Sequence, residues 1–301
     1  MTKPLIVFFG SGPVAAKSLK LLSKHCQVEA IITKPKPGSH KGDFPVIDVA
    51  EDLKIATNYV SNKLELNSLI KNARFNSKLG VIIDFGIIVS QSVIDYFPLG
   101  IVNSHFSLLP QLRGADPITF AILSGQQKTG VSLMLIDAGM DTGKLITQES
   151  INIGVGVTTP ELTEKLILLS DKLLMNYLPK YISGEVKPYT QHNPKQATYS
   201  RKLTKEDGVI DWNKPAEQIE REIRAYIEWP KSRSIIANKD VIITKASVLN
   251  RQLEPGKIII ENKSIIIGCN KNALQIERLR PAGKKEMTAE GFLAGYARLI
   301  Y

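Results

Sequence analysis

The chain has 301 residues, 43% of them apolar and 23% charged, with a formal net charge of +10. This composition is that of a globular protein and excludes a disordered or fibrous one, and the length favours two domains with separate cores. No apolar stretch approaches the roughly 18 residues of a transmembrane helix, and the first apolar run is too short for a signal peptide, so we expect a cytoplasmic protein.

The first half of the chain alternates short β-branched runs with segments of helical periodicity. Strands that are apolar throughout are typical of a parallel sheet that is buried on both faces. We therefore predict an α/β fold, a Rossmann-like and mostly parallel sheet with helices on both faces. The expected strands cover 5–10, 27–34, 78–86 and 98–106, and the expected helices cover 13–24 and 44–54.

Residues 129–150 then predict a strand, a loop punctuated by glycines and a second strand. A long helix is expected over 158–184, because Thr and Pro stand at its start and Gly184 follows its end. The polar segment from Lys187 to Gln196 contains two prolines and little periodicity, which is typical of a linker.

After the linker the pattern changes to a helix over 214–227 and a series of short strand-like runs between turn residues. Such a series favours a small, mostly antiparallel barrel, which we expect to be OB-like. The runs cover 232–237, 241–249, 256–261, 264–269 and 273–279. The expected boundaries are an N-terminal domain over 1–186, a linker over 187–206 and a C-terminal domain over 207–301.

The stretch "GSGPVA", residues 10–15, follows the first expected strand and opens the first helix. It matches the G-x-G-x-x-G/A fingerprint of dinucleotide-binding proteins. The second strand of such proteins ends in an acid that binds the ribose hydroxyls, but here Lys34 stands at that point. An NADP site tolerates a basic residue, so an NADP-linked oxidoreductase stays open. The alternative is a tight turn that needs small residues.

In "GIVNSHF" the alternation of a strand places Asn103 and His105 on the same face. The pair stands at the end of the strand, and ligands of open parallel sheets bind beyond the carboxyl ends of the strands. An amide NH₂ can donate to an oxyanion, and an imidazole can donate to the same oxygen or transfer a proton. Together the two side chains suit acyl transfer.

An acid that orients the histidine is available in the loop "DAGMDTG", as Asp137 or as Asp141, which stands between glycines. The same polar groups could equally be satisfied strand-end and turn residues. The chain has no G-x-S-x-G elbow and no His or carboxylate spacing for a metal, and Cys26 and Cys269 match no CxxC pattern and predict buried, reduced thiols. A site without a protein nucleophile would pass the acyl group directly to its acceptor.

The stretches "NSHFSLLPQLRGADPI", 103–118, and "TGVSLMLIDAGMDTGKLI", 129–146, resemble the 10-formyltetrahydrofolate-dependent formyltransferases. The catalytic Asn, His and Asp of that family fall on Asn103, His105 and Asp141. Two positions depart from the usual family pattern, namely Phe106 in place of a proline and Asp116 in the "RGAAP" segment.

The resemblance implies that 10-formyltetrahydrofolate is the co-substrate, with no metal and no NAD(P). The pterin would bind the backbone of Ile87 and Val89 and lie against Ile94. Residues 107–110, with Arg113 and Gly114, match the signature loop of the family. The cofactor-binding residues expected on this basis are Ile87, Val89, Ile94, Ser107, Leu108, Leu109 and Pro110.

The C-terminal part is similar to the C-terminal domain of the methionyl-tRNA formyltransferases. The similarity rests on three stretches, "ATYSRKLTKEDGVIDW", "IRAYIEWPKSRS" and "LRPAGKKEMTAEGFL". It implies transfer of a formyl group to the α-amino group of methionyl-initiator tRNA by direct attack of the amine, with stabilisation of the oxyanion. We expect a monomer.

The basic excess is concentrated in the same part. Residues 196–301 hold 19 Lys and Arg against 13 Asp and Glu, an excess of +6, so +4 remains for the first 195 residues. Cations clustered in this way favour a polyanionic partner, although a solvated basic surface would have the same composition. The nucleic-acid-binding residues expected here are Arg201, Lys202, Lys205, Arg224, Lys231, Arg233, Lys284 and Lys285. The short loop after the second strand adds Lys34, Lys36, His40 and Lys41, because the corresponding family loop binds the acceptor end.

Three other functions are consistent with some of these features. A formyltransferase for another amine, such as a sugar nucleotide, or a formyl-folate hydrolase would use the same Asn, His and Asp but leaves the basic C-terminal part without a role. An NADP-linked oxidoreductase would use only the glycine-rich turn. A non-catalytic nucleic-acid-binding protein would leave the Asn, His and Asp unused.

Overall fold

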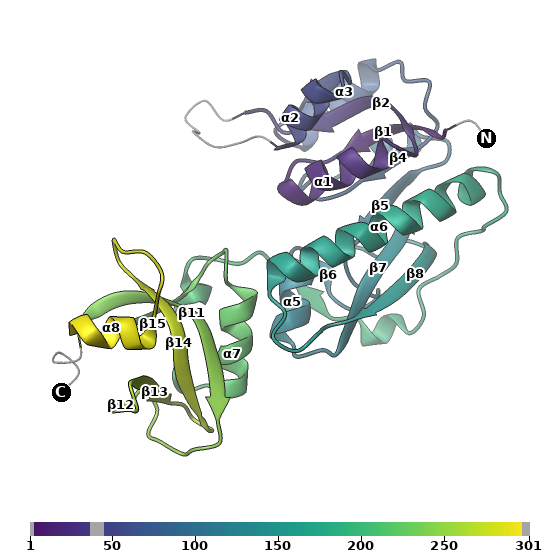
Figure 1. Ribbon diagram of the computed structural model, residues 1–301. Coiled ribbons are helices and arrows are strands. Elements are labelled where there is room, and N and C mark those ends of the chain that lie inside the picture. The colour runs from purple at the N-terminus through teal and green to yellow at the C-terminus, as the bar shows by residue number, and fades with distance from the viewer. Residues whose placement is uncertain (1–2, 37–44, 297–301) are drawn as a thin grey trace. The chain divides into compact units, whose positions relative to one another are not determined.

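The computed structural model describes residues 3–36 and 45–296 (Figure 1). Contacts within the chain define two compact units that interleave along the sequence. Unit 1 comprises residues 1–117, 129–151 and 163–199, and unit 2 comprises residues 118–128, 152–162 and 200–301.

A seven-stranded sheet forms the centre of unit 1, in the order β3-β2-β1-β4-β5-β7-β8. The first five strands are parallel, and β7 runs antiparallel to β5. The prediction of a mostly parallel sheet is confirmed. The strands are β1 (Leu5–Phe9), β2 (Gln27–Thr33), β3 (Thr57–Tyr59), β4 (Gly80–Ile82), β5 (Ile101–His105), β7 (Lys128–Leu135) and β8 (Leu145–Asn152).

Helices cover both faces of this sheet (Figure 1). Side chains of β1 alternate between the faces, so Val7 and Phe9 pack in a cluster with residues of α3 and α4, and Phe8 lies on the side of α1. An ion pair between Lys17 of α1 and Glu164 places α6 beside α1. The helices are α1 (Pro13–Leu22), α2 (Pro45–Asp52), α3 (Lys63–Asn72), α4 (Gln91–Asp95) and α6 (Thr159–Ile182).

Unit 2 is built on a six-stranded antiparallel sheet, in the order β10-β11-β14-β13-β12 with β15 beside β14. Helix α7 buries Ile219 and Ile223 against this sheet, and α8 buries Phe292 in the same core. The antiparallel C-terminal strands predicted from the sequence are confirmed. The elements are β10 (Ser232–Ile236), β11 (Lys239–Leu249), β12 (Ile258–Glu261), β13 (Ser264–Gly268), β14 (Ala273–Pro281), β15 (Met287–Thr288), α5 (Pro117–Leu123), α7 (Ala216–Ala225) and α8 (Ala289–Tyr296).

The segment between α6 and the second sheet is mostly irregular. It contains two short 3₁₀ turns, Pro194–Gln196 and Glu206–Gly208. It also contributes β9 (Tyr199–Ser200), which pairs with β6 (Arg113–Gly114). This pairing ties the segment to the loop that follows β5. Among the residues described, no helix combines the length and apolar character that crossing a bilayer requires.

Candidate active site

Strand β5 places Asn103 and His105 on one face, as the alternation predicted. Asn103 is half-buried and lies opposite Ile82 of β4 and Met134 of β7. Ser104 points to the other face, where its hydroxyl bonds that of Ser170 in α6 at 2.7 Å. The Asn103 amide makes no side-chain hydrogen bond within residues 3–36 and 45–296, so it remains available to a ligand.

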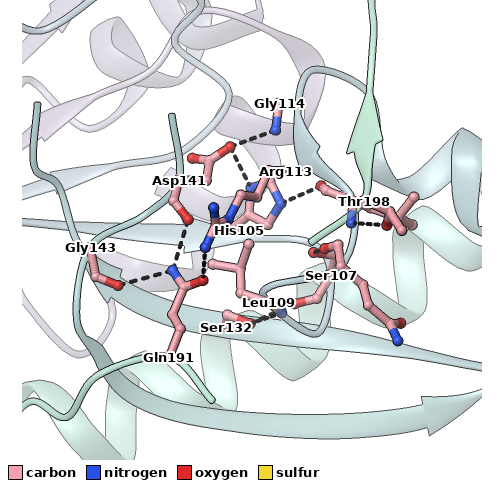
Figure 2. Close-up of polar contacts among 12 residues, drawn as sticks. His105, Ser107, Leu109, Arg113, Gly114, Ser132, Asp141, Gly143, Gln191 and Thr198 are labelled. Atoms are coloured by element: carbon pink, nitrogen blue, oxygen red, sulfur yellow. Dashed lines mark hydrogen bonds and ion pairs between the residues drawn. The ribbon is translucent and has the colours of Figure 1, made fainter. Parts of the chain in front are cut away.

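The imidazole of His105 is 6% exposed and lies between two acceptors (Figure 2). Its Nε2 is 2.9 Å from the Leu112 carbonyl oxygen, and because a carbonyl only accepts, Nε2 carries a hydrogen and donates. Its Nδ1 is 3.8 Å from Oδ2 of Asp141. The bond from Nε2 therefore fixes the orientation of the ring, and this orientation turns Nδ1 toward the Asp141 carboxylate.

Asp141, rather than Asp137, faces the histidine. The Asp141 carboxylate also accepts a hydrogen bond of 2.7 Å from the backbone N–H of Gly114. Asp137 accepts from Gly139 N and from Thr142 Oγ1 at 3.1 and 2.7 Å and so stabilises the turn that contains it. The geometry therefore separates a site aspartate from a turn aspartate. Spacing alone left both open, and the family resemblance implied Asp141.

Gln191 holds the loop that contains Asp141 by bonds to its main chain. Its Nε2 donates to the carbonyl oxygens of Asp141 at 2.7 Å and Gly143 at 3.0 Å, and its Oε1 accepts from Arg113 Nη2 at 2.7 Å (Figure 2). The side chain is only 4% exposed. These three bonds fix the backbone that carries Asp141 relative to the Arg113 segment, so Gln191 is a positioning residue.

Side chains of β7 and β8 hold the signature loop by hydrogen bonds. Ser132 Oγ donates to the Ser107 carbonyl oxygen at 2.6 Å and accepts from Leu109 N at 3.1 Å, and Gln148 Nε2 donates to the Leu109 carbonyl oxygen at 2.8 Å. Ser107 and Leu109 are buried, and the Leu109–Pro110 peptide bond is cis. These contacts set the position of the Leu112 carbonyl group, to which His105 donates.

Thr198 fastens the end of the same loop. Its Oγ1 accepts from Leu112 N at 2.9 Å, and its carbonyl oxygen accepts from Arg113 N at 2.9 Å. Sequence reasoning missed Gln191, Thr198, Ser132 and Gln148. The first two belong to the segment that the sequence predicts as a linker, and no local pattern joins them to residues some 50 or more positions earlier.

The residues expected to bind the folate follow β4. Ile87 and Val89 are half-buried and pack against a cluster that contains Ile94 of α4. No backbone hydrogen bond joins Ile87 or Val89 to another residue in the described part of the chain. Their peptide groups are thus free to form hydrogen bonds with a pterin ring, and the neighbouring apolar side chains could pack against it.

The expected nucleic-acid-binding residues of unit 2 fall into two groups, apart from Arg233, whose Nη2 donates to the Lys205 carbonyl oxygen. Arg201 bonds both carboxylate oxygens of Asp207, and Arg224 bonds those of Glu220 and the Val157 carbonyl oxygen. These two arginines already have protein partners. In the described residues no ion pair is found for the second group, which consists of Lys202, Lys205, Lys231, Lys284 and Lys285.

Arg233 and Lys284 line a cavity of about 670 Å³ in unit 2, together with Arg280. Val209 and Ile235, two exposed apolar side chains, also line this cavity, as does Asp240. The sequence did not single out this combination of cations and apolar surface, because its members come from three separate segments.

The loop after β2 is described only in part. Lys34 Nζ bonds the Gly86 carbonyl oxygen at 3.3 Å, and Lys36 is exposed. His40 and Lys41 lie outside the described residues. Across residues 3–36 and 45–296 no group of His, Cys, Asp or Glu is arranged to hold a metal ion.

Both cysteines are buried and unbonded, as predicted. Burial raises the pKa of the Cys26 thiol to about 12 and that of the Cys269 thiol to about 11. Neither thiol is therefore a nucleophile at neutral pH.

Known proteins match both parts of the chain. The Formyl transferase family matches residues 4–178, and the family described as Formyl transferase, C-terminal domain, matches residues 202–297. A methionyl-tRNA formyltransferase of Thermodesulfovibrio yellowstonii is 33% identical over 96% of this chain and 95% of its own length, and one of Geobacter metallireducens is 32% identical over the same shares.

Among solved structures, an N-formyltransferase from Helicobacter canadensis in complex with folinic acid and dTDP-3-aminofucose has a TM-score of 0.68 and 21% identity. The match covers 91% of this chain and 99% of that one, and at this identity it shows a shared fold. The family matches cover the strand that carries Asn103 and His105 as well as the whole antiparallel sheet of unit 2. The chain belongs to the formyl transferase family.

Proposed function

We propose that this chain transfers the formyl group of 10-formyltetrahydrofolate to the α-amino group of methionyl-initiator tRNA. The observation that carries the proposal is the pairing of Asp141 with His105 beside the Asn103 amide. The acceptor is inferred from the relatives that match nearly the whole chain, which are methionyl-tRNA formyltransferases. No side chain at the site is a nucleophile, in keeping with direct attack by the amine.

In the proposed reaction the α-amino nitrogen attacks the formyl carbon and forms the new C–N bond, and an electron pair moves onto the formyl oxygen. The Asn103 NH₂ donates to this oxygen, and the charge of the protonated His105 lies on the same strand face. Donors placed in advance at a developing oxyanion contribute strongly, because they need no reorganisation during the reaction.

The bond between the formyl carbon and the folate nitrogen then breaks, and its electron pair stays on that nitrogen. The amine loses a proton, and the folate nitrogen gains one. Asp141 supports this movement by facing His105 Nδ1 and so orienting the imidazole. The distance of 3.8 Å between His105 Nδ1 and Asp141 Oδ2 is longer than a hydrogen bond. Such contacts commonly tighten when substrate binds.

The folate fits the segment after β4. The unbonded peptide groups of Ile87 and Val89 would bind the polar edge of the pterin, and Ile94 would line the apolar side. The signature loop, Ser107, Leu108, Leu109 and Pro110, would close the site through the position of its backbone, because Ser107 and Leu109 are buried.

For the tRNA we propose the lysines without ion pairs, together with Arg233, as the phosphate-binding groups. Phosphate contacts give affinity and register, and they make binding sensitive to salt. Arg201 and Arg224 are weaker candidates, since each would have to leave a carboxylate. Lys34, Lys36 and Lys41 of unit 1 complete the proposed set. We expect the chain to act as a monomer.

The test is transfer of labelled formyl from 10-formyltetrahydrofolate to initiator Met-tRNA, with elongator Met-tRNA in parallel. Asn103→Ala and His105→Ala are each expected to lower turnover about 100- to 1000-fold. The matched control is His25→Ala, because His25 also pairs with an aspartate, Asp171, at 3.5 Å but is a residue of the α1–β2 turn. Its turnover should stay within about threefold of the parent.

Undiminished turnover in Asn103→Ala would refute the assignment of the oxyanion donor. Transfer to a sugar-nucleotide amine but to neither tRNA would move the acceptor to that class. Release of free formate without transfer would identify a formyl-folate hydrolase.

A further inference from the structure

The glycine-rich turn between β1 and α1 has no part in the proposed reaction. It joins a parallel strand to the N-terminus of a ten-residue helix, the place where dinucleotide-binding proteins hold a phosphate. The N-cap residue of α1 is Gly12, which has no side chain that could cap the helix. Pro13, the first helical residue, has no N–H. The backbone donors from Ser11 to Ala15 therefore need an acceptor from elsewhere.

Asp84 supplies that acceptor. It follows β4, the parallel neighbour of β1, and its carbonyl oxygen accepts from Ser11 N at 3.0 Å and Gly12 N at 3.3 Å. Desolvation raises the pKa of the Asp84 carboxyl to about 6, and the backbone N–H groups of Ala15 and Val14 partly offset this by favouring the ionised form. Since Pro13 has no N–H, the backbone donors from Ser11 to Ala15 are all directed at this one residue, two of them at its main-chain oxygen and two at its carboxylate.

The carboxylate also fills the space of the turn. A Cβ atom added to Gly12 would lie 1.9 Å from Asp84 Oδ2, so only glycine leaves room for the contact. Two further charges face Asp84, namely Lys34 at the end of β2, which favours its ionised form, and Asp116, which opposes it. Asp84 is itself exposed, so solvent anions reach the position that it occupies.

We propose that Asp84 is a resident substitute for a phosphate and determines specificity by closing the start of α1 to phosphate-bearing ligands. A phosphate that approached the turn would meet donors that are already engaged and a carboxylate of like charge. The same feature explains why a turn that matches the dinucleotide fingerprint belongs here to a formyl transferase. This inference goes beyond the proposed function, because it concerns an anion site at the start of α1, whereas the proposed function assigns the tRNA phosphates to lysine and arginine side chains.

The test compares two substitutions at Asp84. Its φ angle is 49°, a region that both glycine and asparagine tolerate. Asp84→Gly removes the carboxylate and frees the N–H groups of Val14 and Ala15, while the main-chain oxygen of residue 84 still accepts from Ser11 and Gly12. Asp84→Asn removes the charge but keeps a side chain of the same size in the turn. The probe is inorganic phosphate, titrated against chloride at constant ionic strength and followed by thermal unfolding and by ³¹P line broadening.

We expect phosphate to raise the Tm of Asp84→Gly by about 3 to 5 °C at ten times its Kd, and to leave the parent and Asp84→Asn unchanged. Equal phosphate binding by the parent and Asp84→Gly would overturn the proposal, and so would the absence of binding by Asp84→Gly. Asp84→Ser repeats the test if the glycine variant does not fold. None of these readouts depends on formyl transfer, so failure here is separate from failure of the proposed function.

Discussion

Loss of Gln191 offers the sharpest test of how the site is held. In Gln191→Ala three buried polar groups lose their partner: the carbonyl oxygens of Asp141 and Gly143, at 2.7 and 3.0 Å from Nε2, and Arg113 Nη2, at 2.7 Å from Oε1. Each lost bond contributes about 1 kcal/mol, and a buried group without a partner costs about 1–3 kcal/mol. Because water can enter the space of the deleted side chain, we expect a total of about 3 kcal/mol.

The measurement combines urea unfolding with the formyl-transfer assay. The freed Asp141 loop should also lower turnover about 10- to 100-fold, since small displacements of catalytic groups are costly. Gln191→Glu keeps the size of the side chain but replaces the donating Nε2 by an oxygen, which only accepts and so cannot bond the two carbonyl oxygens. This variant should lose activity likewise. Gln252→Ala is the matched control, because Gln252 is exposed and makes one long bond of 3.3 Å to Asn270 O. Stability within about 0.5 kcal/mol and unchanged turnover in Gln191→Ala would refute the positioning role.

Three further predictions concern other parts of the chain. Gly12→Ala should destabilise the parent by about 1–2 kcal/mol, because the added Cβ displaces the Asp84 carboxylate. The same substitution should have no such effect in the Asp84→Gly variant, and equal losses of stability in denaturant unfolding of the two would contradict the contact. Hydrogen bonds from Arg201 hold the pKa of Asp207 well below its usual range, so the stability that this carboxylate contributes is complete above about pH 4. The advantage of the parent over Asp207→Asn in unfolding experiments should shrink progressively as the pH falls from about 4 toward the lowered pKa. Lys284→Ala should reduce the slope of log affinity for tRNA against log salt by about 0.7–0.9 without changing turnover at saturating tRNA; an unchanged slope would remove Lys284 from the interface.

Some elements of the fold carry their own signal in the sequence, and others do not. The continuous apolar run of β1 and the Thr, Pro and Gly punctuation of α6 are local features, so both elements were predictable. Helix α3 buries only Leu66 and Ile70 on a mostly polar surface, and β3 is a three-residue edge strand. Their formation depends on the neighbours against which they pack, which periodicity does not report.

The site divides in the same way. Asn103 and His105 are two residues apart on one strand, so their common face follows from strand geometry. The choice of Asp141 over Asp137 depends on how a loop returns to β5, and the roles of Gln191 and Thr198 depend on a segment that comes back to the loop after β5 from far along the chain. Such contacts between distant segments leave no spacing for sequence reasoning to find.

The return of the segment after α6 limits how this protein can be divided. The side chains that hold the Asp141 loop and the Leu112 carbonyl group come from Gln191 and Thr198, and both belong to unit 1, which extends to Tyr199. A shortened chain that stopped at the end of α6 would keep Asn103 and His105 but lose their scaffold. Evolution could exchange the segment after Tyr199 for another module without disturbing these contacts, because Gln191 and Thr198 would stay with the part of the chain that they hold.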